Sequence, residues 1–371
     1  MHLEYKNKLD ALEVLKTEKA KFSEQIKNKN ILIQGDNLTA LSKLLDTKLR
    51  FDLCYIDPPF ATGNIFKISN DRASTISKSE GDRVAYSDNL KGADFIEFLR
   101  RRIILIRELL TDEGSFYIHT DYKIGHYIKI MLDEIFGIEN FKNDISRIKC
   151  NPKNFSRKAF GNVKDLILFY TKTKNSIWNE PSNSLTDDDI NILFKKIDKN
   201  GRRYNTVPIH APGETKSGAT SQAWKGLIPP KGRHWRCSPA ELDELDKKGL
   251  IEWSSSGNPR RITFADEHKG KKLQDIWTYK DPMYPQYPTE KNFDLLKLII
   301  NASTNEKSIV LDAFCGGGTT LAAAELLGRR WVGIDMSKEA IKVAEKRIKE
   351  YCFMNASSNI QKIKVLESNN K

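Results

Sequence analysis

The sequence predicts an α/β protein whose core is a doubly wound, mostly parallel sheet, and two observations carry that prediction. Apolar runs of strand length alternate along the chain with longer segments whose apolar residues recur at helical spacing, which is typical of a three-layer α/β domain. In addition, two of the predicted strands end in short motifs rich in proline or glycine, at Asp57 and at Asp312. We therefore expect polar groups at the carboxyl ends of these strands.

Each element is assigned from its own stretch of sequence. The predicted strands are 31–36, 52–56, 114–119, 165–170, 308–312 and 330–335, and the predicted helices are 95–110, 123–136, 295–300, 321–327 and 337–350. The run Arg100-Arg101-Arg102 is expected on or beside the polar face of its helix, where a solvated face is favoured over a DNA contact. His119 ends a strand, where it could line a cleft, but an ordinary residue at a strand end is the favoured interpretation.

The first motif is Asp57-Pro58-Pro59-Phe60, which follows the strand 52–56 directly. Proline lacks the backbone N–H that a sheet ladder needs, and it holds the residue before it in an extended conformation. The Asp57 carboxylate, the Pro58 carbonyl and the Phe60 ring are therefore expected together at the carboxyl end of the strand. Two acceptors and an aromatic face match a nucleobase with an exocyclic amine. The plainer alternative is a Pro-Pro turn that only ends the strand.

The second motif is a strand that runs into a glycine-rich turn and a helix, and it contains Asp312, Phe314, Gly316, Gly318 and Thr319. Glycines let the backbone of such a turn approach a ligand closely. A second strand follows and ends at Asp335, where an acid is placed to bind ribose hydroxyls. A nicotinamide-binding Rossmann unit normally has a third glycine where this chain has Leu321, so the turn favours a nucleoside ligand without a diphosphate.

These motifs, in this order, resemble the β class of DNA amino-methyltransferases, which use S-adenosylmethionine (AdoMet). The resemblance covers residues 31–175 and 286–350. It implies a Rossmann-like AdoMet-dependent methyltransferase fold in permuted order, with a target-recognition segment inserted between the two parts. It further implies that Asp57, Pro58, Pro59 and Phe60 are catalytic, that Asp36 faces the adenine of AdoMet, that Asp335 binds its ribose, and that Asp312, Phe314, Gly316, Gly318 and Thr319 hold its amino-acid part.

A third landmark lies just before the glycine-rich strand. The stretch Tyr287-Pro288-Thr289-Glu290-Lys291-Asn292 resembles the His-Pro-Thr-x-Lys-Pro segment of the same family. The resemblance implies that Lys291 binds the methionine carboxylate of AdoMet, whereas the plainer alternative is a surface lysine in a loop. Tyr287 replaces the family's His and Asn292 its last Pro, and the departure leaves Tyr287 without an assigned role.

The order of these motifs divides the chain into four segments. Residues 1–30 are predicted to be an N-terminal helical extension, 31–175 the first part of the catalytic domain, 176–285 the target-recognition segment and 286–371 the second part of the catalytic domain. The two catalytic parts must form one sheet.

Positive charge is concentrated in the middle of the chain. The window Arg147–Arg236 contains 18 Lys or Arg against 7 Asp or Glu, while the whole chain has a net charge of +12. Aromatic residues are interleaved with these cations, which is typical of nucleic-acid binding, and a basic accessory domain is the alternative. The candidate DNA contacts are Arg202, Arg203, Lys231, Arg233 and Arg236.

Composition indicates a cytoplasmic enzyme. No run approaches the roughly 18–20 apolar residues of a membrane span, and the N-terminus has no signal-peptide pattern, so no membrane partner is expected. The five cysteines are odd in number and show no paired metal spacing, which favours free thiols. The six histidines do not cluster either, and the predicted cofactor is AdoMet without a metal.

The predicted reaction is methyl transfer from AdoMet to N6 of an adenine flipped out of double-stranded DNA. Aspartate at the first motif position resembles the adenine enzymes, whereas the family's N4-cytosine enzymes usually carry Ser-Pro-Pro-Tyr; N4-cytosine methylation is the alternative. A nicotinamide oxidoreductase, a catalytically silent DNA-binding protein and an RNA methyltransferase are the remaining alternatives. The sequence leaves open whether the chain forms a homodimer and whether a cognate restriction endonuclease accompanies it.

Overall fold

The computed structural model divides the chain into two compact units. It describes residues 2–16, 29–59, 65–68, 73–74, 83–87, 92–152, 156, 158–285, 287–288, 290–354 and 364–368. The sheet unit comprises Met1–Pro181 and Gln274–Lys371, and the inserted unit comprises Ser182–Leu273. The inserted unit lies within the segment 176–285 that the sequence assigns to target recognition.

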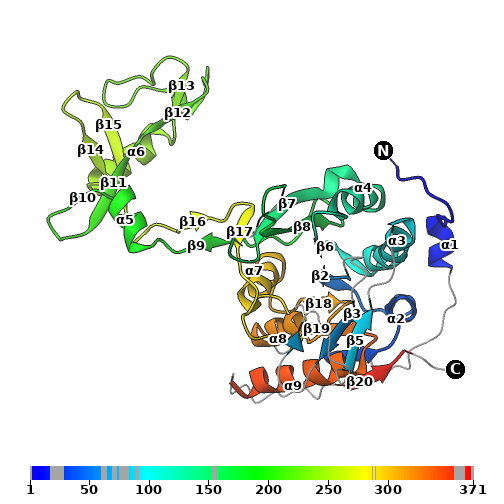
Figure 1. The fold of residues 1–371 in the computed structure, drawn as a ribbon. Helices are drawn as coiled ribbons and strands as arrows, with labels where there is room; N and C mark the ends of the chain where they lie inside the picture. Colours follow the sequence, from blue (N-terminus) through cyan, green and yellow to red (C-terminus); the bar gives the residue numbers. More distant parts are fainter. Residues whose placement is uncertain are drawn as a thin grey trace. The chain divides into compact units, whose positions relative to one another are not determined.

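The α/β prediction is confirmed, because the described residues of the sheet unit form a nine-stranded, mostly parallel sheet (Figure 1). Its order is β17-β7-β8-β6-β2-β18-β19-β1-β20. The strands are β1 (Ile31–Gln34), β2 (Phe51–Ile56), β6 (Leu110–Thr120), β7 (Phe141–Ile148), β8 (Lys164–Thr171), β17 (Ile276–Thr278), β18 (Ile309–Asp312), β19 (Arg330–Asp335) and β20 (Lys364–Glu367). Only β8 runs antiparallel to its neighbours in this sheet, β6 and β7.

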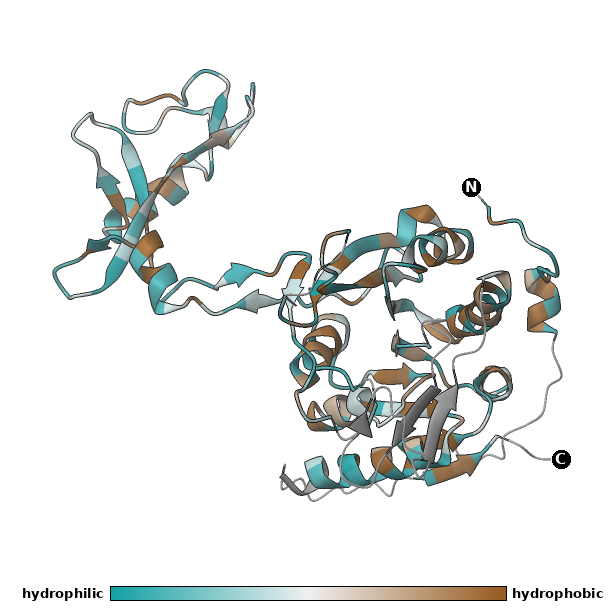
Figure 2. Cartoon of the chain, viewed as in Figure 1, coloured by the Kyte–Doolittle hydropathy of each residue, from teal (hydrophilic) through white to brown (hydrophobic). Residues whose placement is uncertain are grey.

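Helices pack in two layers, one on each face of the sheet (Figure 1). One layer contains α1 (Ala11–Leu15), α2 (Asn37–Leu45), α3 (Gly92–Leu109) and α4 (Gly125–Phe136), and the other contains α7 (Phe293–Ser303), α8 (Thr319–Leu326) and α9 (Lys338–Met354). Strands covered on both faces are expected to be apolar throughout. Accordingly, Ile31, Leu32 and Ile33 of β1 are all fully buried. In Figure 2 helix α9 of this unit alternates hydrophobic and hydrophilic residues, as amphipathic helices do.

The permuted order of the chain produces a switch point at the centre of the sheet. Strand β2 pairs with β18 through Leu53–Val310 and Cys54–Leu311, although the two strands lie more than 250 positions apart. From this pair the chain continues through α3 to β6 on one side and through α8 to β19 on the other. Ligands of open α/β sheets bind in the crevice outside the carboxyl ends of such a strand pair.

The helix that follows the glycine-rich turn packs closely on the sheet even though it lacks the third glycine. A glycine on the neighbouring strand allows this close packing, because a Cβ added to Gly333 of β19 would lie 2.3 Å from Leu321 Cδ1. In a Rossmann unit the helix supplies the glycine at this contact, whereas here the strand supplies it and the helix supplies Leu321.

Three strands of the large sheet, β7, β17 and β20, are absent from the sequence prediction. Strand β7 reads Phe-Lys-Asn-Asp-Ile-Ser-Arg-Ile, so polar residues interrupt its apolar pattern. Strand β17 has only three residues. Strand β20 ends the described chain at the opposite edge of the sheet. Outside the sheet, β3 (Ile65–Ile68), β4 (Ala73–Ser74) and β5 (Arg83–Ser87) form a small antiparallel sheet in the polar stretch that precedes α3.

The inserted unit is mostly β structure around a small aromatic core. A four-stranded antiparallel sheet has the order β10-β11-β15-β14, and β12–β13 and β9–β16 form two further pairs. Its elements are β9 (Ser182–Asn183), α5 (Asp187–Leu193), β10 (Lys196–Ile197), β11 (Arg203–Pro208), β12 (His210–Pro212), β13 (Arg233–Trp235), α6 (Pro239–Lys247), β14 (Ile251–Trp253), β15 (Pro259–Phe264) and β16 (Lys271–Lys272). The core contains Ile209, Trp224, Trp235, Leu242 and Ile251.

The tryptophan indoles of this core are hydrogen-bonded, as buried indole N–H groups usually are. Trp224 donates to Asp243 and Trp235 donates to the Gln222 carbonyl. In neither unit is a described helix long and apolar enough to cross a membrane.

Candidate active site

A cavity of about 630 Å³ opens at the carboxyl ends of β2 and β18, where the switch point predicts a ligand. Its size is typical of small-molecule sites. Residues from both motifs line it, together with the third landmark: Asn37, Tyr55, Asp57, Pro59, Phe98, Tyr287, Glu290, Lys291, Asp312, Phe314, Gly316, Thr319, Asp335 and Arg347 are among them. The structure thus brings residues from opposite ends of the sequence into one cavity.

Asp57 follows β2 and forms an ion pair with Lys291 through its Oδ2 atom. The two side chains are largely buried, with exposed fractions of 16% and 9%. The other oxygen, Oδ1, is buried and has no hydrogen-bond partner among the described residues. A buried acceptor without a donor costs about 1–3 kcal/mol, so this oxygen favours a ligand that brings an N–H or O–H group.

The remaining residues of the first motif are placed in part. Pro58 is buried, and Pro59 lies on the cavity wall. Phe60 lies outside the described residues, so its predicted stacking role stays a prediction.

The glycine-rich turn forms the opposite wall of the cavity. Gly316 and Gly318 adopt the left-handed conformation, with φ of +48° and +75°. Asp335 at the end of β19 shapes the turn by accepting hydrogen bonds from the Gly316 and Ser337 amides, at 2.9 and 2.8 Å. Asp312 at the end of β18 accepts one from the Phe314 amide at 3.0 Å.

Tyr287, which the sequence left unassigned, covers this turn. Its side chain is 4% exposed. A Cβ added to Gly317 would lie 2.7 Å from the Tyr287 Cβ atom, so the ring packs directly on the backbone of the turn. The aromatic residue thus closes the cavity wall where the family pattern has His.

The cavity is electrostatically suited to a cation. Burial, together with the neighbouring carboxylates Asp57 and Asp335, raises the pKa of Asp312 to about 7. Burial also raises the pKa of Asp335. A positive group inside the cavity would stabilise the ionised forms of these acids.

Behind the glycine-rich turn lies an ion pair that the sequence did not predict. Arg347 of α9 is 4% exposed and pairs with Glu290 at 2.6 Å. Its guanidinium also donates to the Thr319 hydroxyl at the start of α8. Arg347 lies in a charged stretch of helix, where the sequence offers no signal that one of many cations is buried.

Asp36 is placed differently from the other predicted cofactor residues. It caps α2 by accepting from the Thr39 amide and pairs with Arg102 at 2.9 Å. The neighbouring Asn37, rather than Asp36, is on the cavity wall in the described part of the chain.

The expectation of a solvated Arg100-Arg101-Arg102 run is therefore wrong for two of its members. Arg100 and Arg102 are each 5% exposed. Arg102 binds Asp36 and Asn37 and stacks on the Phe98 ring, with its guanidinium carbon 3.6 Å from the ring centroid. Arg100 donates to the Leu9 carbonyl at 2.8 Å, so the two buried arginines are covered by different neighbours of α3.

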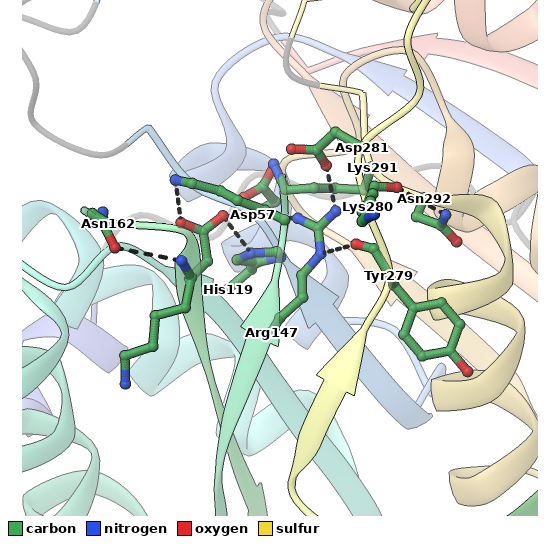
Figure 3. Close-up of polar contacts among 12 residues, drawn as sticks. Asp57, His119, Arg147, Asn162, Tyr279, Lys280, Asp281, Lys291 and Asn292 are labelled. Atoms are coloured by element: carbon green, nitrogen blue, oxygen red, sulfur yellow. Dashed lines mark hydrogen bonds and ion pairs between the residues drawn. The ribbon is translucent and has the colours of Figure 1, made fainter. Parts of the chain in front are cut away.

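A buried polar network lies beside Asp57 and includes His119, which is fully buried (Figure 3). The His119 ring bonds to the Tyr55 hydroxyl at 3.0 Å and to the Asp165 carboxylate at 3.3 Å. Because an ionised carboxylate only accepts, Nε2 carries the proton and Nδ1 accepts from Tyr55. Burial lowers the pKa of His119, which keeps the ring neutral.

Asp165 is the centre of charge in this network. Burial alone would raise its pKa, but the hydrogen bonds from His119 and Lys149 hold the pKa below its ordinary value. Lys149 contacts it at 2.6 Å and Arg147 at 3.7 Å. His119 is thus a fixed member of a network that supports the Tyr55 side of the cavity, rather than an ordinary strand-end residue.

The five basic residues predicted to contact DNA all lie in the inserted unit, and they differ in how they are used. Arg202 binds Asp266 and Glu267 and stacks on Phe264. Arg203 is half-buried in β11 and donates to the Phe194 carbonyl at 3.4 Å. Lys231, Arg233 and Arg236 are exposed at or beside β13.

No group of three or more metal-binding side chains occurs among the described residues. The described cysteines, Cys54, Cys150, Cys237 and Cys315, are free thiols, in agreement with the prediction.

A doubly wound sheet with a cavity at its switch point, an acidic strand end on one side and a glycine-rich turn on the other, defines a Rossmann-like methyltransferase fold. Residues 51–346 match the model of a family described as DNA methylase. The chain belongs to this DNA methylase family and is a DNA methyltransferase.

Individual relatives extend this comparison. The chain is 43% identical over 324 residues to the type II methyltransferase M.EcaI of Enterobacter cloacae, with 86% of this chain and 69% of M.EcaI covered. It is 27% identical over 334 residues to the type II methyltransferase M2.DpnII of Streptococcus pneumoniae, with 87% and 90% covered. It is also similar to the crystal structure of the M1.HpyAVI–SAM complex, with a TM-score of 0.46, 19% identity, and 85% and 99% covered.

Proposed function

We propose that the protein transfers a methyl group from AdoMet to N6 of an adenine flipped out of duplex DNA. The observation that carries the proposal is the pair of features in one cavity. One is a buried Asp57 oxygen that has no partner among the described residues, and the other, facing it, is a glycine-rich turn among acids with raised pKa values. The first fits an amine that donates hydrogen bonds, and the second fits a nucleoside cofactor with positive charge.

The cavity residues fit AdoMet, which when bound supplies an electrophilic methyl group on a sulfonium. In this proposal Asp335 binds the ribose, and the turn from Asp312 to Thr319 holds the amino-acid part. An ammonium has three N–H donors, so pairing of Lys291 with Asp57 is compatible with a second contact to the methionine carboxylate. Asp36 is engaged by Arg102, and we expect it to support Asn37 beside the adenine.

Asp57 and the Pro58 carbonyl then accept hydrogen bonds from the two N–H groups of the target amine, while Phe60 stacks on the base. These contacts orient the nitrogen lone pair towards the methyl group. Positive charge develops on the nitrogen during attack, so fixed acceptors bind the transition state more strongly than the neutral amine. The amine becomes acidic once it is alkylated, and no covalent enzyme intermediate is needed.

The choice of N6-adenine rests on Asp57 at the first motif position. The family includes N6-adenine and N4-cytosine enzymes alike, and the two amines present the same pair of N–H donors. N4-cytosine methylation therefore remains the second candidate. We extend to this chain the restriction–modification setting that the names of its relatives state, with a cognate endonuclease directed at the same sequence.

The decisive experiment is to express the chain in a host without DNA methylation and to sequence the native DNA with a modification-sensitive method. N6-methyladenine in one short sequence is the expected result, and it also reveals the recognition site. N4-methylcytosine would replace the proposal by its alternative. Unmodified DNA, with AdoMet binding intact, would redirect the search to RNA.

A further inference from the structure

The segment that joins β17 to α7 forms a closed loop with one buried and one exposed side. The Asn292 side chain donates to the Lys280 carbonyl at 2.9 Å, so the two ends of the loop are held together (Figure 3). Asn292 also caps α7 by accepting from the Leu295 amide. Loops of this length with joined ends are compact and frequently functional.

The loop is anchored to the sheet on its first side. Arg147 of β7, which is fully buried, donates to the Tyr279 carbonyl at 2.7 Å and pairs with Asp281 (Figure 3). The Asp281 amide donates to the Lys149 carbonyl at 3.0 Å. These contacts fix the backbone immediately before the exposed part of the loop.

The second side of the loop belongs to the cavity. Tyr287 packs on the glycine-rich turn, and Lys291 pairs with Asp57. Three peptide steps of 3.8 Å place the Tyr284 Cα atom within about 11 Å of the Tyr287 Cα atom. The tip of the loop therefore lies close to the cavity that receives the target base in the proposed function.

Two large apolar side chains stand in solvent at this tip. Met283 is 82% exposed and Tyr284 is 87% exposed, the latter being among the most exposed aromatic residues in the described chain. Lys280, also exposed, precedes them. Met283 and Tyr284 are adjacent and together form a small exposed apolar patch beside a cation, and exposed apolar patches rimmed by polar residues mark interaction sites.

We propose that Met283 and Tyr284 enter the DNA base stack and occupy the gap that the flipped base leaves. Proteins that distort duplex DNA insert apolar side chains between base steps, and a flipped base leaves an unstacked position that costs a few kcal/mol. A base stacks on an aromatic face irrespective of sequence. The proposal rests on the proposed function, since it supplies the step by which the target base leaves the duplex.

The size of the patch favours DNA over a protein partner. A stable protein–protein interface buries about 800 Å² on each side, far more than two side chains provide. A gap in a base stack is, in contrast, the size of one planar group, and the neighbouring Lys280 suits a phosphate backbone.

The test uses the full-length protein and two duplexes that carry the recognition sequence. One has 2-aminopurine in place of the target adenine and reports flipping, and the other keeps the adenine, whose N6 amine accepts the methyl group. The fluorescence of 2-aminopurine rises when it unstacks. We expect the double variant Met283→Ala/Tyr284→Ala to lower the flipping signal and the methylation rate about tenfold or more, because the flipped state loses its replacement stacking. AdoMet binding should be unchanged. Tyr284→Phe should retain most of the signal, since the ring is kept.

A matched control is Tyr127→Ala, which removes a 54% exposed tyrosine from α4 and should leave flipping unchanged. A further duplex keeps the target adenine but has an abasic site opposite it. This duplex distinguishes loss of the stacking contact of Met283 and Tyr284 from a general loss of catalytic activity. Its target is already unpaired, so the double variant should methylate it within about threefold of the unaltered protein.

The outcomes distinguish this proposal from the proposed function. Normal flipping and methylation by the double variant would overturn only the proposed insertion of Met283 and Tyr284 into the base stack. Altered sedimentation of the double variant, with normal flipping, would overturn it in favour of a protein contact. If the unaltered protein methylates no DNA base, the proposed function fails, and the proposed insertion of Met283 and Tyr284 fails with it.

Discussion

The sheet unit and the inserted unit differ in whether their charged side chains are buried. Among the described residues, the charged side chains that are buried all belong to the sheet unit: Lys43, Arg100, Arg102, Asp121, Arg147, Asp165, Lys291, Asp312 and Arg347. The inserted unit has 17 Lys or Arg against 12 Asp or Glu in 182–273, and its core consists of Ile, Leu and Trp. Its charges stay in contact with water.

The difference matters because buried charge and exposed charge do different work. Electrostatic interactions strengthen as water is excluded, so the fixed charges around the cavity can distinguish between a ground state and a transition state. Exposed cations act through counterion release, which gives affinity for any polyanion and depends on salt. We therefore expect variants of the sheet unit to alter chemistry and cofactor binding, and variants of the inserted unit to alter DNA affinity.

The largest effect is expected for Asp57→Ala. Because Asp57 supplies the acceptor for the target amine, methyl transfer should fall by about 10³-fold or more, as for the loss of other preorganised groups that stabilise transition-state charge. AdoMet binding should remain nearly intact, since the glycine-rich turn holds the cofactor. Equilibrium binding of AdoMet and a single-turnover methylation assay measure the two quantities.

The isosteric Asp57→Asn is the second variant, because it keeps the volume beside Lys291. It should lose methyl transfer as well, since its amide places a donor where the amine needs an acceptor. A loss of AdoMet affinity in both variants would show that the β2 end of the cavity binds cofactor rather than substrate.

The converse result is expected for Gly318→Ala. The φ of +75° is unfavourable for alanine, and the added Cβ would lie 2.6 Å from the Ala344 Cβ atom. Strain and overlap together should cost about 2–4 kcal/mol of unfolding free energy and displace the turn, so that AdoMet affinity falls. Calorimetry and thermal unfolding measure both effects.

Gly328→Ala is the matched control for this variant. Gly328 has a similar φ of +71°, but a Cβ there meets nothing within 4 Å. It should carry only the backbone cost of about 1–2 kcal/mol and bind AdoMet normally. Equal cofactor binding by the two variants would contradict the role assigned to the turn.

A smaller effect, confined to DNA affinity, is expected in the inserted unit. The triple variant Lys231→Gln/Arg233→Gln/Arg236→Gln removes three exposed cations. Each lost phosphate contact should reduce the slope of log K against log salt by about 0.9 and weaken binding at low salt. Fluorescence anisotropy with a duplex at several salt concentrations measures the slope.

Arg202→Gln is the control, because the Arg202 guanidinium is already bound to Asp266 and Glu267. Its salt slope should remain close to that of the unaltered protein, and AdoMet binding should be unchanged in every variant. A greater loss of DNA affinity for Arg202→Gln than for the triple variant would place the DNA surface on the β11 side of the unit.

The sequence predicted the parts of the site that lie within a single motif. Asp57 and the Gly316–Gly318 turn could be placed because proline and glycine constrain the backbone locally, whatever surrounds them. The α/β class followed from strands buried on both faces, whose apolar runs need no partner to be recognised.

The parts that depend on long-range contacts were not predictable. Lys291 reaches Asp57 across 234 positions, and Arg347 reaches Glu290 from a helix rich in charge. In a single sequence a buried cation reads like an exposed one, which is also why the inward orientation of Arg102 was missed. Gly333 shows the same limit, since its closeness to Leu321 appears only once helix and strand are packed.

The smallest effect concerns stability, and it tests whether buried charge in the sheet unit has a cost. The pKa of Asp312 is raised from 3.8 to about 7 in the folded protein. Between these values the folded state holds a proton that the unfolded state has released, so the free energy of unfolding falls as the pH rises from about 4 to 7. Asp312→Asn removes this dependence and keeps an acceptor for the Phe314 amide. Without ligand, the variant should therefore gain about 1 kcal/mol relative to the unaltered protein between pH 5 and pH 8, well below the roughly 4 kcal/mol that the full shift allows.

Thermal unfolding of both proteins from pH 5 to pH 8 measures the difference, and the other titrating groups cancel in the comparison. Asp112→Asn is the control for an Asp-to-Asn change as such, because the Asp112 side chain is 86% exposed. A difference that stays constant across this range would mean that Asp312 is ionised in the empty cavity throughout. In that case Lys291 and Arg347 would already neutralise the cavity, and the affinity for AdoMet would have to arise from hydrogen bonds and packing rather than from attraction of its positive charge to the buried acids.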